Sequence, residues 1–406
     1  MRIAILSESY EPVQNGVSTS VRTLADELRG KLHHVCVIAP QHPENEQGTF
    51  VIRVPSWLSP LNEDYPLPYP VFPKLRLEFN KMDIDVIHTQ SPWFLGLLGA
   101  RLAKQSKIPL VSTYHTLYNH YGHYLFFLPK PAVESMLQWW LPDYYNKCTH
   151  IIVPSQVAAE SLKSAGVQRP MSIIPTGAPL PDTICFTSRS KKAIRARFGI
   201  PATAKLLLYA GRLAQEKNIE LVLSAFSRVA MEHENVWLLI VGGGPHEPQC
   251  RHLASRMRSG NRIVFAGPMS RHELDPIFAS ADIFVFGSST ETQGLVIAEA
   301  RAAGTPSVVV NGGGAPENVK HGEDGFVVPP EADVFAKHIN MLLQDNKLLK
   351  TMSEACKRNA VHFTPDNMAN QVLEVYRNVI EMNRAISSNK SKVSRRSRLK
   401  DNYGID

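Results

Sequence analysis

Cysteine and long apolar runs are both scarce in this chain of 406 residues. The five cysteines are odd in number, lie far apart and form no Cys-x-x-Cys pair, which argues against a disulfide framework or a zinc site and fits a reducing compartment. No stretch reaches the roughly 18 consecutive apolar residues of a transmembrane helix. Residues 1–8 carry charge too early for a signal peptide. We therefore expect a cytoplasmic protein.

The composition is that of a globular protein, with 44% hydrophobic and 20% charged residues, and the length suggests two domains. The net charge of +7 is unevenly distributed, because residues 389–400 contain six Lys or Arg and no acid. We expect residues 389–406 to be a disordered basic tail that meets anionic lipid or remains solvated. We expect no nucleic-acid partner.

Short apolar runs alternate with helix-like segments in both halves of the chain, which predicts doubly wound parallel sheets of the α/β class. The predicted strands are residues 3–7, 35–39, 50–54, 86–89, 110–114, 151–154, 172–175, 206–210, 237–241, 263–266, 283–286, 307–310 and 326–328. The character of the sequence changes after Pro175-Thr176-Gly177. We therefore predict domains at 1–182 and 183–365, followed by a helix at 366–388.

Residues 286–305 form the central functional candidate. A buried strand leads through a polar loop into a helix that ends at Gly304, and such a loop at the carboxyl end of a sheet is where α/β folds bind anionic ligands. We expect Glu291 to lie in the loop and Glu299, eight residues later, inside the helix. Counted along a helix, eight residues span about 12 Å, so the pair could hold two ends of an elongated ligand such as a nucleotide-sugar. The alternative is two ordinary surface carboxylates.

Two further loops suit a diphosphate. Arg212 and Lys217 follow a strand and a glycine turn, where two cations can bind phosphate. Gly16 opens a helix after the first strand and allows a phosphate close to the backbone, although the loop has no Gly-x-Gly-x-x-Gly fingerprint. The alternative is that Arg212 and Lys217 are ordinary surface charges and that Gly16 belongs to a tight turn.

A histidine and an aromatic segment follow the strand at 110–114. His115 lies where that strand ends, which favours a functional role. The next residues alternate aromatic and polar side chains, which suits a lipid headgroup region. The residues assigned to this acceptor or membrane surface are Tyr118, Tyr121, Tyr124, Phe126, Phe127 and Lys130. A metal site at His115, His120 and His123 is disfavoured, because no acidic or Cys partner lies nearby in sequence. A metal site at the Asp83-x-Asp85 pair is also disfavoured. The pair precedes a strand instead of following one, so it lies at the end of the sheet opposite to the one that binds ligands.

In these motifs the chain resembles the retaining glycosyltransferases of family 4, which have two Rossmann-like domains facing each other across a cleft, the fold called GT-B. The wording Thr290-Glu291-Thr292-Gln293-Gly294 is most similar to the branch that glycosylates diacylglycerol. The resemblance covers residues 1–386. It implies that the last helix crosses back to the first domain and that His115 lies beside the transferred sugar.

The resemblance also implies roles for individual residues. Catalysis would depend on His115, Glu291, Arg212 and Lys217. The donor would contact Gly16, Arg212, Lys217, Gly267, Met269, Glu291, Gln293, Gly294, Leu295 and Glu299. No side chain is placed to act as a covalent nucleophile, and no metal is expected. No cofactor is expected either, because the nucleotide-sugar is a substrate.

The expected function is therefore transfer of a hexose, glucose from UDP-glucose, to a membrane lipid such as 1,2-diacylglycerol, by an enzyme held peripherally at the inner membrane face. Alternatives within the family are a phosphatidylinositol mannosyltransferase or an enzyme with a soluble acceptor. Outside it, a nucleotide-sugar epimerase or a non-catalytic binding module remains open.

Overall fold

The structure of the chain is a computed structural model. It describes residues 1–13, 15–43, 50–59, 62–69, 79, 81–118, 130–181 and 187–403. These residues form two compact units. Unit 1 comprises Met1–Pro154, Ala158–Ile174 and Asp366–Asp406, and unit 2 comprises Ser155–Val157 and Pro175–Pro365.

The boundary that the sequence places near residue 182 lies earlier, at Pro175. Thr176 already bonds to the side chain of Gln293, and the Ala178 N–H donates to the Phe363 carbonyl at 2.9 Å. Both partners belong to unit 2. The chain therefore enters unit 2 before the change of composition that suggested the boundary.

Unit 1 is built on a parallel sheet with the strand order β3-β2-β1-β6-β7-β8-β9. The strands of unit 1 are β1 (Arg2–Leu6), β2 (His34–Pro40), β3 (Val51–Val54), β6 (Val86–Thr89), β7 (Leu110–Thr113), β8 (His150–Val153) and β9 (Met171–Ile173), with a separate antiparallel hairpin of β4 (Ser56–Ser59) and β5 (Asn62–Pro68). The chain order reverses between β1 and β6. That reversal is the topological switch point, where loops on neighbouring strands diverge and leave room for a ligand.

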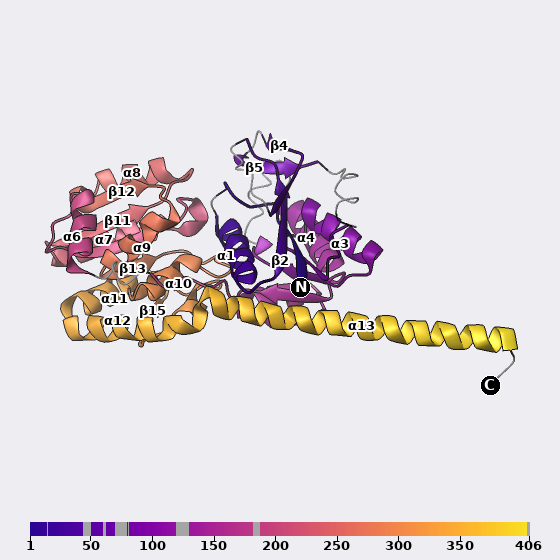
Figure 1. Cartoon of the computed structure of the whole chain (residues 1–406). Helices are drawn as coiled ribbons and strands as arrows, with labels where there is room; N and C mark the ends of the chain where they lie inside the picture. The colour runs from indigo at the N-terminus through magenta and orange to yellow at the C-terminus, as the bar shows by residue number, and fades with distance from the viewer. Residues whose placement is uncertain are drawn as a thin grey trace. The chain divides into compact units, whose positions relative to one another are not determined.

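Helices flank this sheet, and Figure 1 shows that the last of them, drawn in yellow, continues beyond it toward the C-terminus. They are α1 (Gly16–Gly30), α3 (Phe94–Ser106), α4 (Lys130–Tyr145), α5 (Gln156–Ser164) and α13 (Pro365–Tyr403). Helix α1 begins after Asn15, whose side chain accepts the Ser18 N–H at 2.9 Å, and such a cap satisfies one of the unpaired N–H groups of the first turn. Its apolar face, including Val21, Leu24 and Leu28, is buried in the core.

Helix α13 completes the core of unit 1. Met368, Val372, Tyr376 and Val379 are all buried in the same cluster as Ile3 of β1. The sequence predicts that this helix ends near residue 388 and that a disordered tail follows, but the helix continues to Tyr403. The reason is local, because residues 381–403 contain neither Gly nor Pro to end it.

Unit 2 repeats the plan with a parallel sheet in the order β12-β11-β10-β13-β14-β15. Its strands are β10 (Lys205–Ala210), β11 (Val236–Val241), β12 (Ile263–Gly267), β13 (Ile283–Phe286), β14 (Ser307–Val310) and β15 (Gly325–Val328). Its α-helices are α6 (Ser188–Arg197), α7 (Ile219–Glu232), α8 (Glu247–Ser255), α9 (Arg271–Ser280), α10 (Leu295–Ala302), α11 (Ala332–Gln344) and α12 (Asn346–Ala360). Short 3-10 helices are η4 (Gln215–Lys217), η5 (Gly260–Arg262), η6 (Ala315–Asn318) and η7 (Val361–Phe363).

The switch point of unit 2 lies between β10 and β13, which are neighbours in the sheet although two strands separate them in sequence. The strands here are continuous apolar runs buried on both faces, as expected for a parallel sheet covered by helices. The predicted α/β class and the doubly wound parallel sheets are confirmed in each unit. The loops that follow β10 and β13 carry the residues singled out in the sequence.

Candidate active site

Lys217 and Glu291 meet at the switch point of unit 2. Lys217 ends the loop after β10, and Glu291 lies in the loop after β13. The Lys217 Nζ atom donates to Glu291 Oε1 at 2.5 Å, and the two side chains are only 15% and 13% exposed. A charge-assisted hydrogen bond with so little solvent around it is strong and well oriented. The structure therefore brings together a cation and an acid that lie 74 residues apart.

Glycines fix the path of the β10 loop. A Cβ on Gly242 would lie 1.9 Å from the Gly211 carbonyl oxygen, and one on Gly244 would lie 2.3 Å from that of Leu213. This close approach allows the Leu213 N–H to donate to the Gly243 carbonyl at 2.8 Å. The loop after β11 thus supports the loop that carries Lys217, and no larger residue fits at either glycine.

A second glycine loop supports Glu291. The Gly314 N–H donates to the Glu291 carbonyl at 2.7 Å. A Cβ on Gly313, which has a φ of +57°, would lie 2.5 Å from the same carbonyl oxygen, and one on Gly314 would lie 2.1 Å from that of Thr292. The segment after β14 is therefore packed directly against the backbone of the Glu291 loop.

Glu299 lies inside α10 and is 8% exposed. The guanidinium of Arg271, at the start of α9, donates to its carboxylate. Burial raises the pKa of Glu299 to about 7, Arg271 opposes that rise, and the charge of Asp275 adds to it. Arg271 is a residue that the sequence reasoning missed. Its second terminal nitrogen, Nη2, is buried and finds no hydrogen-bond partner among the described residues.

The helical rise used to estimate the spacing of Glu291 and Glu299 does not apply between them. Helix α10 begins only at Leu295, after Gly294 in the left-handed conformation with a φ of +80°. Glu291 precedes the helix by four residues and lies in the loop, as the sequence predicts, so the 12 Å estimate for a continuous helix has no basis here. The two carboxylates are placed by separate contacts, with Lys217 and with Arg271.

The other predicted donor residues of unit 2 take several positions. Arg212 is exposed in the same loop as Lys217. Gly267 has a φ of +76° with open space where a Cβ would lie, and the neighbouring Met269 packs against the core. Leu295 is half-buried at the start of α10. The side chain of Gln293 is buried and bonds to the backbone of Thr176, so it does not project from the loop.

In unit 1, His115 follows β7 as predicted. Its Nε2 atom lies 2.7 Å from Gln90 Oε1, and burial lowers the pKa of His115 to about 4. The imidazole is therefore neutral near pH 7. With the Nε2 proton donated to the Gln90 carbonyl, Nδ1 is left as an acceptor.

A second buried histidine lies beneath it and was not anticipated from the sequence. His88 is fully buried, with Nδ1 at 2.6 Å from the Tyr376 hydroxyl and Nε2 at 2.7 Å from Thr113 Oγ1. Burial, with a smaller contribution from His115, lowers the pKa of His88 to about 3. A histidine in the middle of an apolar strand gives no signal of its partner when that partner lies 288 residues away.

Glu8 occupies the switch point of unit 1. It follows β1 and accepts hydrogen bonds from Ser91 Oγ and from the Leu95 N–H, both at 2.8 Å. Burial raises the pKa of Glu8 to about 7, and these two donors only partly offset the rise. The signal that could have found it is an acidic residue directly after the first strand. Gly16, at the start of α1, has open space around its Cβ position.

The predicted aromatic surface is only partly described. Tyr121, Tyr124, Phe126 and Phe127 lie outside the described residues, as do His120, His123 and the side chain of Lys130. Tyr118 is half-buried, and Trp93 packs against it edge-on at 5.5 Å between ring centroids. It belongs to an aromatic cluster and is not an open surface residue as predicted, because Tyr114 also packs against it.

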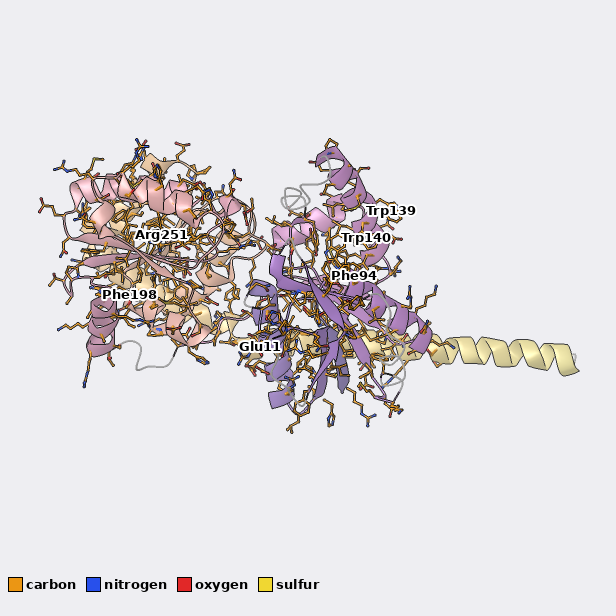
Figure 2. The ribbon with its side chains drawn as sticks, turned by 90° about the horizontal axis from the view of Figure 1, so that it is seen from above. Glu11, Phe94, Trp139, Trp140, Phe198 and Arg251 are labelled. Atoms are coloured by element: carbon orange, nitrogen blue, oxygen red, sulfur yellow. The ribbon has the colours of Figure 1, made fainter. Side chains whose placement is uncertain are left out.

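Other aromatic residues are exposed next to that cluster. Trp140 stacks on Trp93 at 5.8 Å, while Trp139 is 65% and Phe94 44% exposed. Trp139, Trp140 and Phe94 can be followed in Figure 2 on α4 and at the start of α3. Exposed tryptophan beside a buried aromatic cluster is typical of surfaces that meet a partner or a membrane interface.

Two family models match the chain in succession. Residues 14–180 match Glycosyltransferase Family 4, and residues 190–379 match Glycosyl transferases group 1. An alpha-monoglucosyldiacylglycerol synthase of Streptococcus pneumoniae is 32% identical over 314 residues, which are 76% of this chain and 70% of that protein.

The chain belongs to glycosyltransferase family 4. A second relative of this family, an alpha-monoglucosyldiacylglycerol synthase of Acholeplasma laidlawii, is 29% identical and covers 94% of this chain and 98% of its own. A GDP-mannose-dependent alpha-mannosyltransferase of Corynebacterium glutamicum is 26% identical, covering 95% of this chain and 91% of that protein. The resemblance to the diacylglycerol branch inferred from residues 290–294 is thus confirmed.

The solved structure of Anabaena HepE in complex with UDP has the same fold, with a TM-score of 0.74 at 21% identity over 93% of this chain and 100% of that one. The predicted GT-B class, with two Rossmann-like domains, is confirmed for this family 4 glycosyltransferase. Within the described residues, no helix is long and apolar enough to cross a membrane, and no cluster of three or more His, Cys, Asp or Glu is suited to a metal ion. The expectation that no metal is needed remains a prediction.

Proposed function

We propose that this glycosyltransferase moves glucose from UDP-glucose to a hydroxyl of a membrane lipid, with 1,2-diacylglycerol as the acceptor, and that the anomeric configuration is retained. The observation that carries the proposal is the Lys217–Glu291 pair at the switch point of unit 2. A cation and an acid in direct contact suit a ligand that is anionic on one side and rich in hydroxyls on the other.

The chemistry follows from the charges. The C1–O bond of the donor breaks, and negative charge accumulates on the departing diphosphate. Lys217 and Arg212 neutralise that charge, and such electrostatic stabilisation is usually the largest catalytic contribution. The Glu291 carboxylate accepts hydrogen bonds from hexose hydroxyls and orients the ring.

Glu299 and Arg271 suit the nucleoside end of the donor. An ionised carboxylate can accept hydrogen bonds from both ribose hydroxyls. Arg271 favours that ionised form, since its guanidinium opposes the effect of burial on the pKa of Glu299. The backbone around Gly267 and Met269 would contact the base, and the N–H groups at Gly294 and Leu295 the phosphate.

In unit 1, the neutral His115 can accept a hydrogen bond from a substrate hydroxyl through Nδ1. Retention requires attack on the face that the diphosphate leaves, with a phosphate oxygen receiving the proton of the acceptor hydroxyl. No protein nucleophile or metal takes part in this scheme, so chelation of divalent ions should leave the reaction intact.

The lipid acceptor is supported by the two relatives that are named diacylglycerol enzymes. It is further supported by the exposed aromatic residues Trp139 and Phe94. Tryptophan and phenylalanine settle at the headgroup level of a bilayer, and the basic residues between 389 and 400 favour anionic lipid. We propose peripheral attachment to the cytoplasmic face of the membrane.

The direct test uses the purified protein with vesicles that contain 1,2-diacylglycerol and an anionic lipid. Labelled UDP-glucose, UDP-galactose and GDP-mannose are supplied separately, with and without EDTA, and the lipid products are resolved and their anomeric configuration determined. We expect an α-glucosyl lipid from UDP-glucose in both conditions. Transfer only from GDP-mannose would favour the mannosyltransferase alternative that the Corynebacterium relative supports.

A further inference from the structure

The two residues that follow Glu291 are bonded to distant parts of the chain. The Thr292 carbonyl accepts the Ser155 hydroxyl at 2.6 Å. Gln293 makes a pair of bonds with one residue, because its Oε1 accepts the Thr176 N–H and its Nε2 donates to the Thr176 carbonyl, both at 2.9 Å. All four residues are buried. We refer to the two Gln293–Thr176 bonds as the Gln293 clasp.

The bonded segments are those at which the chain passes between the units. Ser155–Val157 is a short insertion of unit 2 between two stretches of unit 1, and Pro175 begins the long stretch of unit 2. Glu317 adds to the same cluster, since its carboxylate accepts the N–H groups of Gln156 and Val157 at 2.7 and 3.0 Å. The Glu291 loop is therefore fastened to both linking segments.

The clasp engages both backbone polar groups of Thr176, the N–H and the carbonyl. A side chain that cannot form hydrogen bonds would remove both of these bonds from the buried Thr176 backbone, and losing bonds to buried polar groups is costly. The clasp also acts within two residues of Glu291, where the backbone is already confined by Gly313 and Gly314. A loosened residue 293 would let the Glu291 backbone shift away from Lys217.

We propose that Gln293 is a positioning residue, which fixes the Glu291 carboxylate for the hexose by clasping Thr176. This inference rests on the proposed function. It gives a role to the Gln293 side chain, whereas the predicted donor contact at Gln293 is made by N–H groups of the loop. It predicts that breaking the clasp harms the orientation of the hexose and leaves the nucleoside diphosphate bound.

The experiment compares two substitutions with a matched control. Gln293→Met keeps the approximate volume and removes both bonds, whereas Gln293→Glu keeps an oxygen for the Thr176 N–H and places another against the Thr176 carbonyl. The control is Asn359→Ala, in the same unit, because Asn359 is also a buried amide and bonds to Lys320, Glu323 and Asp324 instead. Its loss should lower stability without touching the Glu291 loop.

Three quantities are measured: the rate of transfer from UDP-glucose to 1,2-diacylglycerol, the ratio of UDP-glucose hydrolysis to transfer, and the Kd of UDP. The ratio does not depend on the fraction of folded enzyme. For Gln293→Met we expect transfer to fall and the hydrolysis ratio to rise by about tenfold or more, since small misplacements of reacting groups cost that much. The Kd of UDP should change by less than about twofold. Gln293→Glu should lie between Gln293→Met and wild type, and Asn359→Ala should keep the wild-type ratio.

A wild-type hydrolysis ratio in Gln293→Met, whatever its stability, would overturn the inference. So would a loss of UDP affinity that matches the loss of transfer, because Gln293 would then contact the donor. Amide hydrogen exchange of residues 174–178 and 288–294 without any ligand is a separate test of the clasp. It should accelerate in Gln293→Met and not in Asn359→Ala, even if the wild-type protein fails to use UDP-glucose and the proposed function is wrong.

Discussion

The switch points of the two units share a topology and differ in charge. In unit 2, the loops after β10 and β13 bring Lys217 into contact with Glu291. In unit 1, the loops after β1 and β6 bring Glu8 to Ser91 Oγ and the Leu95 N–H, both neutral donors. One parallel-sheet plan thus produces a charged anchor for an anionic ligand and, in the other unit, a neutral polar edge.

The buried carboxyl groups extend the comparison. The pKa values of Glu8 and Glu299 are both raised to about 7 by burial. Among the residues that the structure describes, a guanidinium contacts Glu299, from Arg271, and none contacts Glu8. The nearby histidines of unit 1, His88 and His115, have pKa values lowered by burial and are neutral at pH 7. Unit 1 is therefore suited to neutral hydroxyl groups, and unit 2 to charged ones.

The largest effect should come from removing the cation of unit 2. Lys217→Met should reduce transfer by about 10²- to 10³-fold, because charge on the departing diphosphate is no longer neutralised. The control is Lys205→Met at the opposite end of β10, where the lysine bonds only to Asn346 among the contacts of its side chain that the structure records. Initial rates with labelled UDP-glucose measure both. Equal losses in the two variants would break the comparison.

The next effect concerns the neutral histidine of unit 1. His115→Ala should lower the rate of transfer by about tenfold or more. The pH profile of the wild type should contain no transition near pH 6.5 that is due to His115. The sign follows from the lowered pKa, since the neutral form is already complete well above pH 4. His150→Ala is the matched control, because His150 opens β8 at the other end of the sheet and bonds to Ser172. A transition in the activity profile near pH 6.5 that is lost in His115→Ala would show that the imidazole becomes charged there. It would contradict the conclusion that the histidines of unit 1 are neutral at pH 7.

A smaller effect is expected at Arg271, which should affect binding of the donor and not the rate of the catalytic step. Arg271→Met should raise the KM for UDP-glucose by about tenfold at pH 7, the equivalent of one lost charge-assisted contact, and change kcat little. In the wild type, donor affinity should improve as pH rises through about 7, because Glu299 ionises there. Arg271→Met should move that improvement to higher pH, Arg271→Lys should restore it, and Glu299→Gln should abolish it.

Arg197→Met serves as the control for Arg271→Met. Arg197 forms an exposed ion pair with Glu273, which lies on α9 as Arg271 does. It should leave the KM for UDP-glucose unchanged. If the KM of Arg271→Met equals that of the wild type at every pH from 6 to 8, Arg271 lies outside the donor site.

The smallest effect is on stability. A carboxyl with a raised pKa contributes stability below its unfolded value of 4.5, and this contribution is lost as pH rises through about 7. Glu8→Gln, which stays neutral, should therefore raise Tm at pH 8 by about 2–4 °C and have little effect at pH 4.5. Glu299→Gln should gain less, because it leaves the Arg271 guanidinium unpaired. Thermal unfolding at the two pH values measures both, and equal gains would remove the difference between the two carboxyls.

The fold was largely predictable because each strand is a local apolar run. All thirteen strands read from the sequence are present in the two parallel sheets, with ends shifted by one or two residues. The sequence also predicted that Lys217 and Glu291 converge on one site, since both residues follow strands, although it did not predict their direct contact. Local patterns carry this much information.

What the sequence did not reveal depends on long-range contacts or on a single backbone angle. The left-handed conformation of Gly294 interrupts the path between Glu291 and Glu299, so the helical rise that the sequence suggested for spacing them does not apply. The partner of Glu299, Arg271, lies 28 residues away and has no motif of its own. The side chain of Gln293 turns toward Thr176, 117 residues earlier, instead of toward a ligand. Neither the periodicity nor the spacing of residues in the sequence predicts this backbone angle or these two contacts.

The docking of α13 on β1 and β2 has a consequence for biosynthesis. The core of unit 1 combines residues from the first forty positions with Met368, Val372, Tyr376 and Ile380. The α13 residues leave the ribosome only after Pro175–Pro365, the long stretch of unit 2, has already emerged. Unit 2 should therefore mature first during translation, while the earlier-made domain waits, incompletely packed, for its final helix.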